Sequence, residues 1–250
     1  MAINPLESIE MTDVGIDATL EGVELQSSQL DLTKLPDLVV SGTALIDFKN
    51  TPDVVLRSSI SLALLFASRV ATKAVTPGEG DEDDWLAQYT QALTGIGFRI
   101  SGMNIVHSEI KKKNVSVHKA ILPLLTLAFG GAAVGPVILQ ALKSLDEMDE
   151  QSPWITLFDR QTRRFDVSEM HFAAVNASAV DTTIQYAIAR LHVETGETTI
   201  LFFKLSETGA RFDSTSTTLT ADNGLLASIE PKLRTKLLSI IDDTIAGAEI

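Results

Sequence analysis

The chain has 250 residues, of which 45% are hydrophobic, and a mean hydropathy of +0.18, values typical of a well-buried globular protein. Its formal net charge of -13 leaves no basic surplus to displace counterions, so we expect no nucleic-acid partner, and any membrane affinity must be mainly apolar. The chain has no cysteine, which excludes disulfides, thiolate chemistry and cysteine metal ligands.

The first 50 residues carry the weakest pattern of the chain. Gly15–Leu25 and Leu38–Phe48 have strand character, and a polar stretch with Pro36 separates them. Residues 1–7 lack the basic region and apolar core of a secretory signal, so we expect export, if it occurs, by another route. We predict a single domain over residues 1–250.

Two helices are predicted next. The first begins after Thr51 as a cap and Pro52 and ends at Pro77-Gly78, with a polar stripe at helical spacing formed by Arg57, Ser61, Ser68 and Thr72. The second covers 81–95, and Trp85, Leu86, Tyr89 and Leu93 form its buried side. Its first residues, Asp81-Glu82-Asp83-Asp84, could bind a cation. Acidic residues also favour a helix N-terminus, and that interpretation is preferred because the spacing is not that of a calcium loop.

The middle of the chain combines one strand with a long apolar segment. Phe98–Ile110 is predicted to be a strand with a weak point at Gly102, and the lysines at 111–113 form either a solvated loop or a lipid head-group contact. The 23 residues Ala120–Leu142 carry no charge and are long enough to span a bilayer as one helix. Glycine and proline instead favour a buried helical hairpin, Leu122–Phe129 and Pro136–Met148. A phosphate-loop interpretation of the same glycines is weak, because no lysine follows Gly135.

The second half of the chain predicts long strands at Phe165–Ala177, Thr182–Val193, Thr198–Leu205 and Arg211–Thr220. Short links between them favour an antiparallel meander. In the second strand neither face is cleanly polar. One face carries Ile184, Tyr186, Ile188, Arg190 and His192, and the other carries Thr183, Gln185, Ala187, Ala189, Leu191 and Val193. Ile200–Phe203 is apolar on both faces, so we expect helices on both sides of the sheet.

Two further elements flank the meander. We expect Trp154–Phe158 to be a strand, and Asp159–Arg164 to be a turn with a basic patch of Arg160, Arg163 and Arg164. That patch could contact phosphate, although an exposed turn is the commoner role. A last helix is predicted to begin near Glu230-Pro231.

Catalytic and metal-binding motifs are not recognisable in the sequence. His171 and His192 lie on neighbouring predicted strands, but two histidines fall short of a zinc site, and a hydrogen-bonded sheet histidine is preferred. HExxH, GxSxG and P-loop patterns do not occur. We therefore expect a protein that is not an enzyme, without a catalytic site, a metal or a cofactor.

The order of these elements resembles that of the Cyt-type δ-endotoxins, a cytolytic fold family, and related Cyt-like bacterial virulence factors. The resemblance covers roughly Thr51 to Thr220. It is carried by the helix pair, the strand and basic turn, Asn114-Val115-Ser116-Val117, the glycine-interrupted apolar helices, Trp154-Ile155, and the long strands with Ile200-Leu201-Phe202-Phe203. It implies an α+β fold in which helical hairpins flank both faces of a central antiparallel sheet of long strands, a Cyt-like three-layer sandwich.

The resemblance also implies a function. Family members bind membrane phospholipid directly and permeabilise it, by strand insertion or detergent-like disruption, so we expect a membrane-disrupting toxin that acts at a target-cell membrane after release without a signal peptide. Oligomers on the membrane are compatible with this function. A non-lytic lipid- or partner-binding virulence module on the same fold is the alternative. The hypothesised membrane-interacting residues are Phe172, Ile184, Tyr186, Ile188, Phe202 and Phe203. Gly130, Gly131 and Gly135 are predicted to form a hinge, and Arg160, Arg163 and Arg164 to contact head groups.

Overall fold

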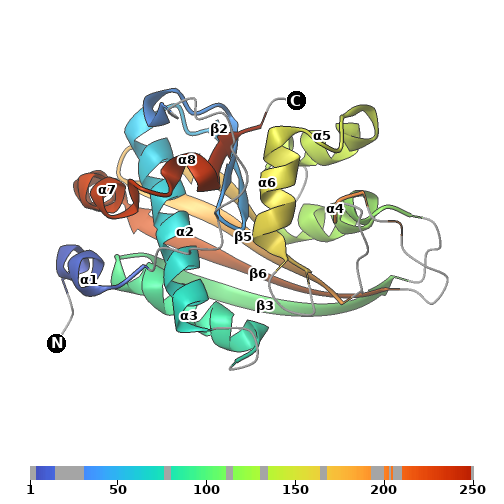
Figure 1. Cartoon of the computed structure of the whole chain (residues 1–250), viewed down its shortest axis with the longest axis horizontal. Helices are drawn as coiled ribbons and strands as arrows, with labels where there is room; N and C mark the ends of the chain where they lie inside the picture. The colour runs from blue at the N-terminus through green and yellow to red at the C-terminus, as the bar shows by residue number, and fades with distance from the viewer. Residues whose placement is uncertain are drawn as a thin grey trace.

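A computed structural model describes residues 4–14, 31–75, 80–110, 115–129, 135–163, 168–192, 200–202, 204 and 210–248 (Figure 1). It shows a mixed α+β fold built on one large sheet. The helices are α1 (Pro5–Met11), η2 (Leu32–Lys34), α2 (Val54–Ala74), α3 (Glu82–Gly95), α4 (Val117–Ala128), α5 (Pro136–Ser144), η3 (Leu145–Glu147), α6 (Pro153–Thr162), α7 (Asn223–Leu237) and α8 (Ile241–Thr244). The strands are β1 (Leu38–Ser41), β2 (Ala44–Asn50), β3 (Arg99–Ile110), β4 (Ser168–Ala177), β5 (Asp181–His192), β6 (Ala210–Asp222) and β7 (Ile245–Gly247).

The described residues form a 7-stranded sheet in the order β3-β6-β5-β4-β2-β1-β7. The predicted antiparallel meander is confirmed for β4, β5 and β6, and β3 pairs antiparallel with β6. The sheet is not wholly antiparallel, because β2 pairs parallel with β4. The helices α2 to α6 lie between these two strands in the chain, and so long a connection permits a parallel pair that short turns cannot form.

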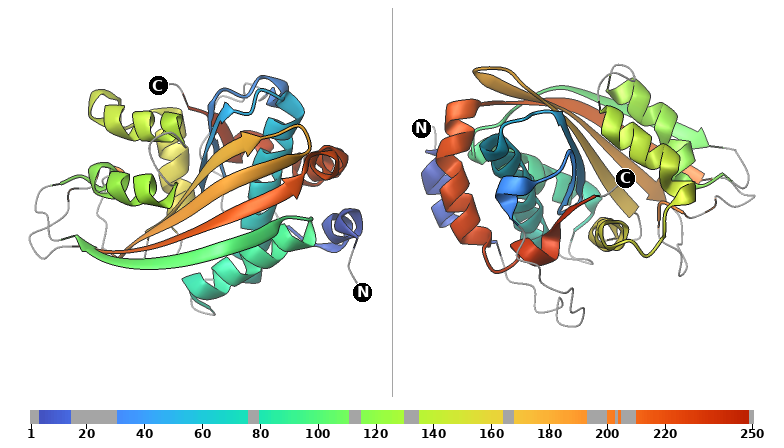
Figure 2. Two further views of the ribbon diagram at one scale, coloured as in Figure 1. Left: turned by 180° about the vertical axis from the view of Figure 1, so that it is seen from behind. Right: turned by 90° about the horizontal axis from the view of Figure 1, so that it is seen from above.

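Three strands at one side of the sheet are unusually long. β3 and β5 have 12 residues each and β6 has 13, against a usual length of about 5–6 (Figure 2). The predicted weak point in β3 is confirmed: the register against β6 shifts between Ser101 and Asn104, and Gly102 lies there with a φ of +70°. A positive φ is readily adopted by glycine and rarely by other residues.

Apolar side chains pack on both faces of the sheet. We call one face the α3 face, because its buried residues share a core cluster with α2, α3 and α7; on β4, β5 and β6 they are Ala173, Val175, Ile184, Tyr186, Ile188, Leu219 and Ala221. We call the other the α4 face, because its buried residues share a cluster with α4, α5 and α6; on β4 and β5 they are Met170, Phe172, Ala174, Ala187, Ala189 and Leu191. The expected alternation of β5 is thus confirmed. Gln185 and Thr218 on the α4 face are half-exposed.

Helix α2 lies in the middle of the α3-face core. It begins at Val54, with Asp53 as its cap rather than Thr51, because the Asp53 side chain accepts hydrogen bonds from the amides of Val55 and Leu56. Ser61 and Ser68 of the predicted polar stripe are buried. Among the described residues α2 is long and apolar enough to cross a membrane, but 78% of its apolar window is buried in the fold, as in a core helix.

The predicted apolar hairpin corresponds to α4 and α5, with different limits. α4 begins at Val117 and includes Pro123, whereas α5 begins at Pro136 as predicted and gives way to η3 after Ser144. Gly135 has a φ of +69°, and a Cβ there would lie 2.7 Å from the Phe129 ring. This glycine therefore allows the close approach of the chain to Phe129 before α5. Gly130 and Gly131 lie outside the described residues.

The prediction of a strand at Trp154–Phe158 is wrong. This segment belongs to α6, in which Pro153 occupies the first turn and Trp154, Ile155, Leu157 and Phe158 are buried. Buried positions at this spacing follow the helical period, and proline is favoured in the first turn of a helix. The arginines predicted to lie in a turn are therefore placed differently, since Arg160 lies in the last turn of α6 and Arg163 directly follows it.

One other predicted strand and one predicted helix start are wrong. Ile200 and Leu201 form a buried turn rather than a strand, and the only sheet-like contact of the described part of this segment is a bridge between Lys204 and Ser116. Their apolar character reflects burial against the α4-face cluster. Helix α7 begins at Asn223, well before Pro231, because the Asp222 side chain caps it by accepting from the amide of Leu225.

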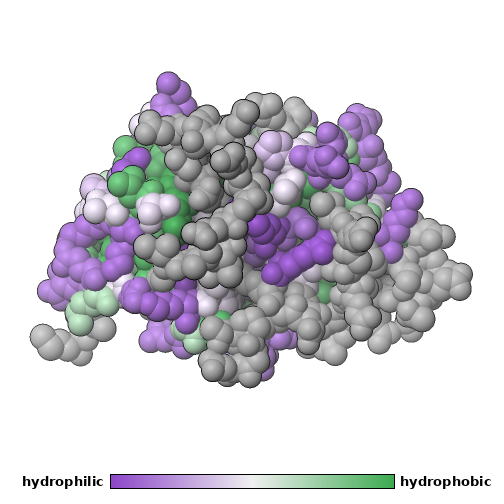
Figure 3. Space-filling view, viewed as in Figure 1, coloured by the Kyte–Doolittle hydropathy of each residue, from purple (hydrophilic) through white to green (hydrophobic). Residues whose placement is uncertain are grey.

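The N-terminal region is described in part. The predicted strand over Leu38–Phe48 is a hairpin of β1 and β2, turned at Gly42 with a φ of +56°. Gly15–Leu25 lies outside the described residues. On the side of the molecule shown in Figure 3, most of the coloured surface is hydrophilic. Few large apolar side chains of the described residues are exposed; they are Met11, Val54, Val55, Leu127, Val180 and Leu238.

Candidate functional site

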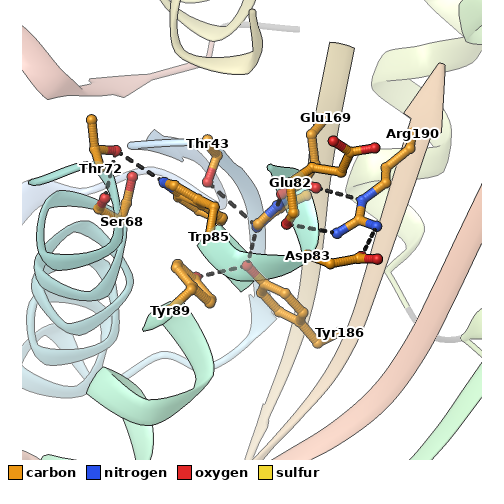
Figure 4. Close-up of polar contacts among 11 residues, drawn as sticks. Thr43, Ser68, Thr72, Glu82, Asp83, Trp85, Tyr89, Glu169, Tyr186 and Arg190 are labelled. Atoms are coloured by element: carbon orange, nitrogen blue, oxygen red, sulfur yellow. Dashed lines mark hydrogen bonds and ion pairs between the residues drawn. The ribbon is translucent and has the colours of Figure 1, made fainter. Parts of the chain in front are cut away.

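A network of polar side chains lies buried between α3 and the sheet (Figure 4). At its centre is His171 of β4, which is 0% exposed. The Nε2 atom of His171 lies 2.6 Å from Oε1 of Glu169, and its Nδ1 atom lies 2.6 Å from the hydroxyl of Tyr186. That hydroxyl is in turn 2.7 Å from the hydroxyl of Tyr89 on α3. The chain of contacts therefore runs from the sheet into the helix.

Aromatic rings enclose the histidine. Trp85 and Tyr89 of α3 stack on each other with ring centroids 5.1 Å apart. Both present an edge-to-face contact to His171, with centroids at 5.5 and 5.4 Å. The Trp85 indole N–H donates to Thr72 of α2 at 3.1 Å. The prediction that Trp85 and Tyr89 belong to the buried side of α3 is confirmed.

Arg190 of β5 connects this network to the N-terminus of α3. Its Nε donates to Oε2 of Glu169 at 2.6 Å, and its other nitrogens donate to the Asp83 carboxylate at 2.5 Å and to the Glu82 carbonyl at 3.0 Å. Asp81 caps the same helix in a capping box with Asp84. The acidic cluster thus has the helix-terminal role preferred from the sequence, and one of its members, Asp83, also binds the sheet.

The charges of this network stabilise one another. Burial opposes ionisation of Glu169, but the hydrogen bond from His171 and the charge of Arg190 outweigh it, so the pKa of Glu169 is lowered. Burial likewise opposes the charge of Arg190, yet the Glu169 and Asp83 carboxylates raise the pKa of its guanidinium. Both groups are therefore ionised at neutral pH, and they form an ion pair between β4 and β5 within the network.

The network is closed to solutes in this conformation. Trp85, Tyr89 and Tyr186 are at most 3% exposed. Beside them lies an apolar hollow of about 20 Å³, room for about one water molecule, lined by Leu86, Tyr89 and Thr90 of α3 and by Ile188, Thr215 and Thr217 of the sheet. Among the described residues, no group of three or more potential metal ligands occurs. This arrangement joins α3 to the sheet, and its buried groups, His171 and Glu169, lie beneath the rings of α3.

A second buried carboxylate joins the other helical layer to the sheet. Asp47 of β2 is 2% exposed and accepts hydrogen bonds from the amides of Val137 and Ile138, at 2.7 and 3.3 Å, in the first turn of α5. Burial is the main reason why the pKa of Asp47 is raised. The first turn of a helix offers free N–H groups and a positive dipole, which explains why a carboxylate is placed there.

The six residues predicted to meet the membrane do not form one surface. Ile184, Tyr186 and Ile188 lie on the α3 face. Phe172 lies on the α4 face, where its ring contacts Phe158. Phe202 packs outside the sheet against the α4-face cluster, and Phe203 lies outside the described residues.

The predicted basic patch is partly paired. Arg163 forms an ion pair with Asp159 at 3.1 Å, Arg160 is half-buried, and Arg164 lies outside the described residues. The preferred interpretation of His171 as a hydrogen-bonded sheet histidine is confirmed. His192 ends β5 opposite Arg211.

Sequence reasoning missed the network itself. Glu169 and His171 are two residues apart on β4 and therefore share a face, as Arg190 and Tyr186 do on β5. The face of each residue could be predicted from the sequence. Their meeting depends on the register of β4 against β5, which pairs Glu169 with Arg190. That register joins residues far apart in the chain, and strand pairing leaves no local signal.

Comparison with known proteins finds distant similarity to solved structures. No family model and no curated protein matches the chain. A solved structure described as a delta-endotoxin is similar in fold, with a TM-score of 0.41 and 10% sequence identity over 81% of this chain and 87% of that chain.

Proposed function

We propose that this protein is a membrane-disrupting toxin or virulence factor that acts directly on phospholipid, with the two helical layers and the sheet forming a Cyt-like three-layer sandwich. The observation that carries the proposal is a ribbon of two long strands, β5 and β6, whose apolar face is buried beneath helices. β5 and β6 reach 12 and 13 residues, and a transmembrane strand needs about 9–11.

The helices hold this ribbon in a form compatible with water. Ile184, Tyr186, Ile188 and Leu219 are at most 4% exposed under α2 and α3. Burying such a side chain is worth about 1.5–3 kcal/mol, so the layer does not leave the sheet in water unless another apolar phase replaces it. Lipid hydrocarbon is such a phase, and opening on a membrane is therefore the step that the proposal requires.

The charge of the protein favours neutral membranes. A net charge of -13 repels the anionic lipids that attract basic proteins. Binding must then come from apolar contact after opening rather than from long-range attraction. We expect lysis to be stronger on neutral phosphatidylcholine vesicles than on vesicles rich in phosphatidylserine.

Dye release tests the proposal. The protein is added to phosphatidylcholine vesicles that contain a self-quenching dye, and sedimentation of the vesicles measures binding in parallel. Binding with release is the expected result. Binding without release would support the non-lytic lipid-binding alternative, and absence of both would contradict any direct action on phospholipid.

A further inference from the structure

The paired strands β5 and β6 have two faces of different chemistry. We propose that the α3 face of this ribbon contacts lipid hydrocarbon and that its α4 face lines water. This assignment rests on the proposed function and adds to it the orientation of the inserted strands. It is argued from the register, which decides which side chains of the two strands share a face.

On the α3 face the register places apolar residues of β5 opposite one leucine and two threonines of β6. Ile184 lies opposite Leu219, Tyr186 opposite Thr217, and Ile188 opposite Thr215. Thr217 donates from its hydroxyl to the carbonyl of Ser101 on β3 at 2.9 Å. A hydroxyl satisfied within the sheet can enter hydrocarbon at a much smaller penalty than a free one. This face therefore suits lipid once α3 has left.

The α4 face of the same ribbon is small and polar. Between Thr183 and Ala189 its cross-strand pairs are Thr183–Thr220, Gln185–Thr218, Ala187–Ser216 and Ala189–Ser214, and beyond them Leu191 lies opposite Phe212. Thr218 donates to Oε1 of Gln185 at 3.2 Å, and both side chains are half-exposed in the closed protein. Membrane barrels alternate an apolar lipid face with a polar lumen face, and these two strands do so in register.

Charged residues mark the two ends of the ribbon. Asp181 lies opposite Asp222 at one end, and Arg190 lies opposite Asp213 at the other, with no charged residue between them on either strand. At about 3.3 Å per residue, the uncharged stretch and its two flanking charges extend about 30 Å along β5. A tilt of about 35–45° reduces that length to roughly 21–25 Å, close to the apolar band of about 25 Å in membrane barrels. The charges then lie at the two membrane surfaces.

This orientation has a consequence for the helical layers. α3 covers the lipid-facing side, so the contacts of Arg190 with Asp83 and of Tyr186 with Tyr89 must break before insertion. The α4–α5 hairpin covers Ala187 and Ala189 on the water-facing side, so it must also clear the ribbon, although it need not meet lipid.

Two adjacent threonines give a matched test. The chain has no cysteine, so Thr217→Cys and Thr218→Cys each create a unique site for an NBD fluorophore. Both residues are half-buried neighbours on β6, and they point to opposite faces. Each labelled protein is added to phosphatidylcholine vesicles, with nitroxide-labelled lipid as a membrane quencher and iodide as an aqueous quencher.

We expect nitroxide lipid to quench the label at 217 several-fold more than the label at 218, and iodide to show the opposite preference. Equal quenching, or the reverse preference, in protein that still releases dye would overturn the face assignment and leave the proposed function standing. Failure of the unlabelled protein to bind vesicles would overturn both. Thr215→Cys and Ser216→Cys repeat the test if a label at 217 or 218 prevents folding.

Discussion

The ion pair between Glu169 on β4 and Arg190 on β5 allows a quantitative test of how the sheet surface beneath α3 is stabilised. The side chains of Glu169 and Arg190 are 8% and 13% exposed, and their atoms lie 2.6 Å apart. Glu169→Gln keeps the shape but removes the charge, leaving the guanidinium with Asp83, whose side chain is 80% exposed. Removing one partner of a buried ion pair costs about 3–5 kcal/mol, and the remaining contact with Asp83 favours the lower value. We expect a loss of about 3 kcal/mol in the free energy of unfolding, about a hundredfold in the folding equilibrium constant.

Urea denaturation followed by tryptophan fluorescence measures this loss. Trp85 lies in α3 and Trp154 in α6, so Trp154→Phe leaves a single reporter for the α3 layer. Lys34→Ala is the control, because Lys34 forms an exposed pair with Asp31 and should contribute less than about 1 kcal/mol. A loss below about 1 kcal/mol for Glu169→Gln would refute the view that this buried pair stabilises the sheet beneath α3.

The same pair predicts a dependence on pH. In the folded protein the pKa of Glu169 lies below its ordinary value of 4.5. The unfolded chain therefore takes up the proton at a higher pH than the folded chain does. The stabilisation from Glu169 is therefore complete above about pH 4.5 and is lost as the pH falls through the lowered folded value. Glu169→Gln should remove this part of the acid destabilisation, so the difference between the two proteins should shrink on acidification.

Two further predictions concern the turn before α5 and the opening of α3. Gly135→Ala should be destabilised by about 2–3 kcal/mol, because the new methyl would meet the Phe129 ring, whereas Gly102→Ala, also at positive φ but with no atom within 4 Å of its Cβ, should lose about 1 kcal/mol. Urea midpoints decide between them, and equal losses would contradict the role of the ring. A reducible bismaleimide joining Thr90→Cys to Thr217→Cys, across the hollow beneath α3, should abolish dye release until it is cleaved. The same variant blocked with a monofunctional maleimide is the control, and full release by the tethered protein would rule out opening of α3.

Much of the secondary structure could be predicted from local patterns. The alternation in β5 assigned Ile184, Tyr186 and Ile188 to one face, and the structure places them together. The helix at 81–95 was recognised because acidic residues mark its start and Trp85 and Tyr89 recur at helical spacing. Such patterns are readable because period and burial act on residues close together in the chain.

Local patterns failed where tertiary packing supplied the deciding contacts. Ile200 and Leu201 have strand composition, yet they form a buried turn, and the Leu201 carbonyl accepts from His118 instead of from a neighbouring strand. The first helix of the apolar hairpin is predicted to begin at Leu122, yet α4 starts at Val117 because Val117 and Ile121 are buried in the α4-face core. In both places burial outweighed local propensity, which is a weak determinant by comparison.

By itself, the sequence determined that long amphipathic strands would be covered by apolar helices, because hydrophobic periodicity is written into neighbouring residues. Only the tertiary structure decided that β2 pairs parallel with β4, that Glu169 meets Arg190, and that the apolar residues of β5 and β6 share one face. These arrangements depend on strand register between distant segments. A shift of one residue would move every side chain to the other face, so the total burial of the sheet selects the register, and no single segment encodes it.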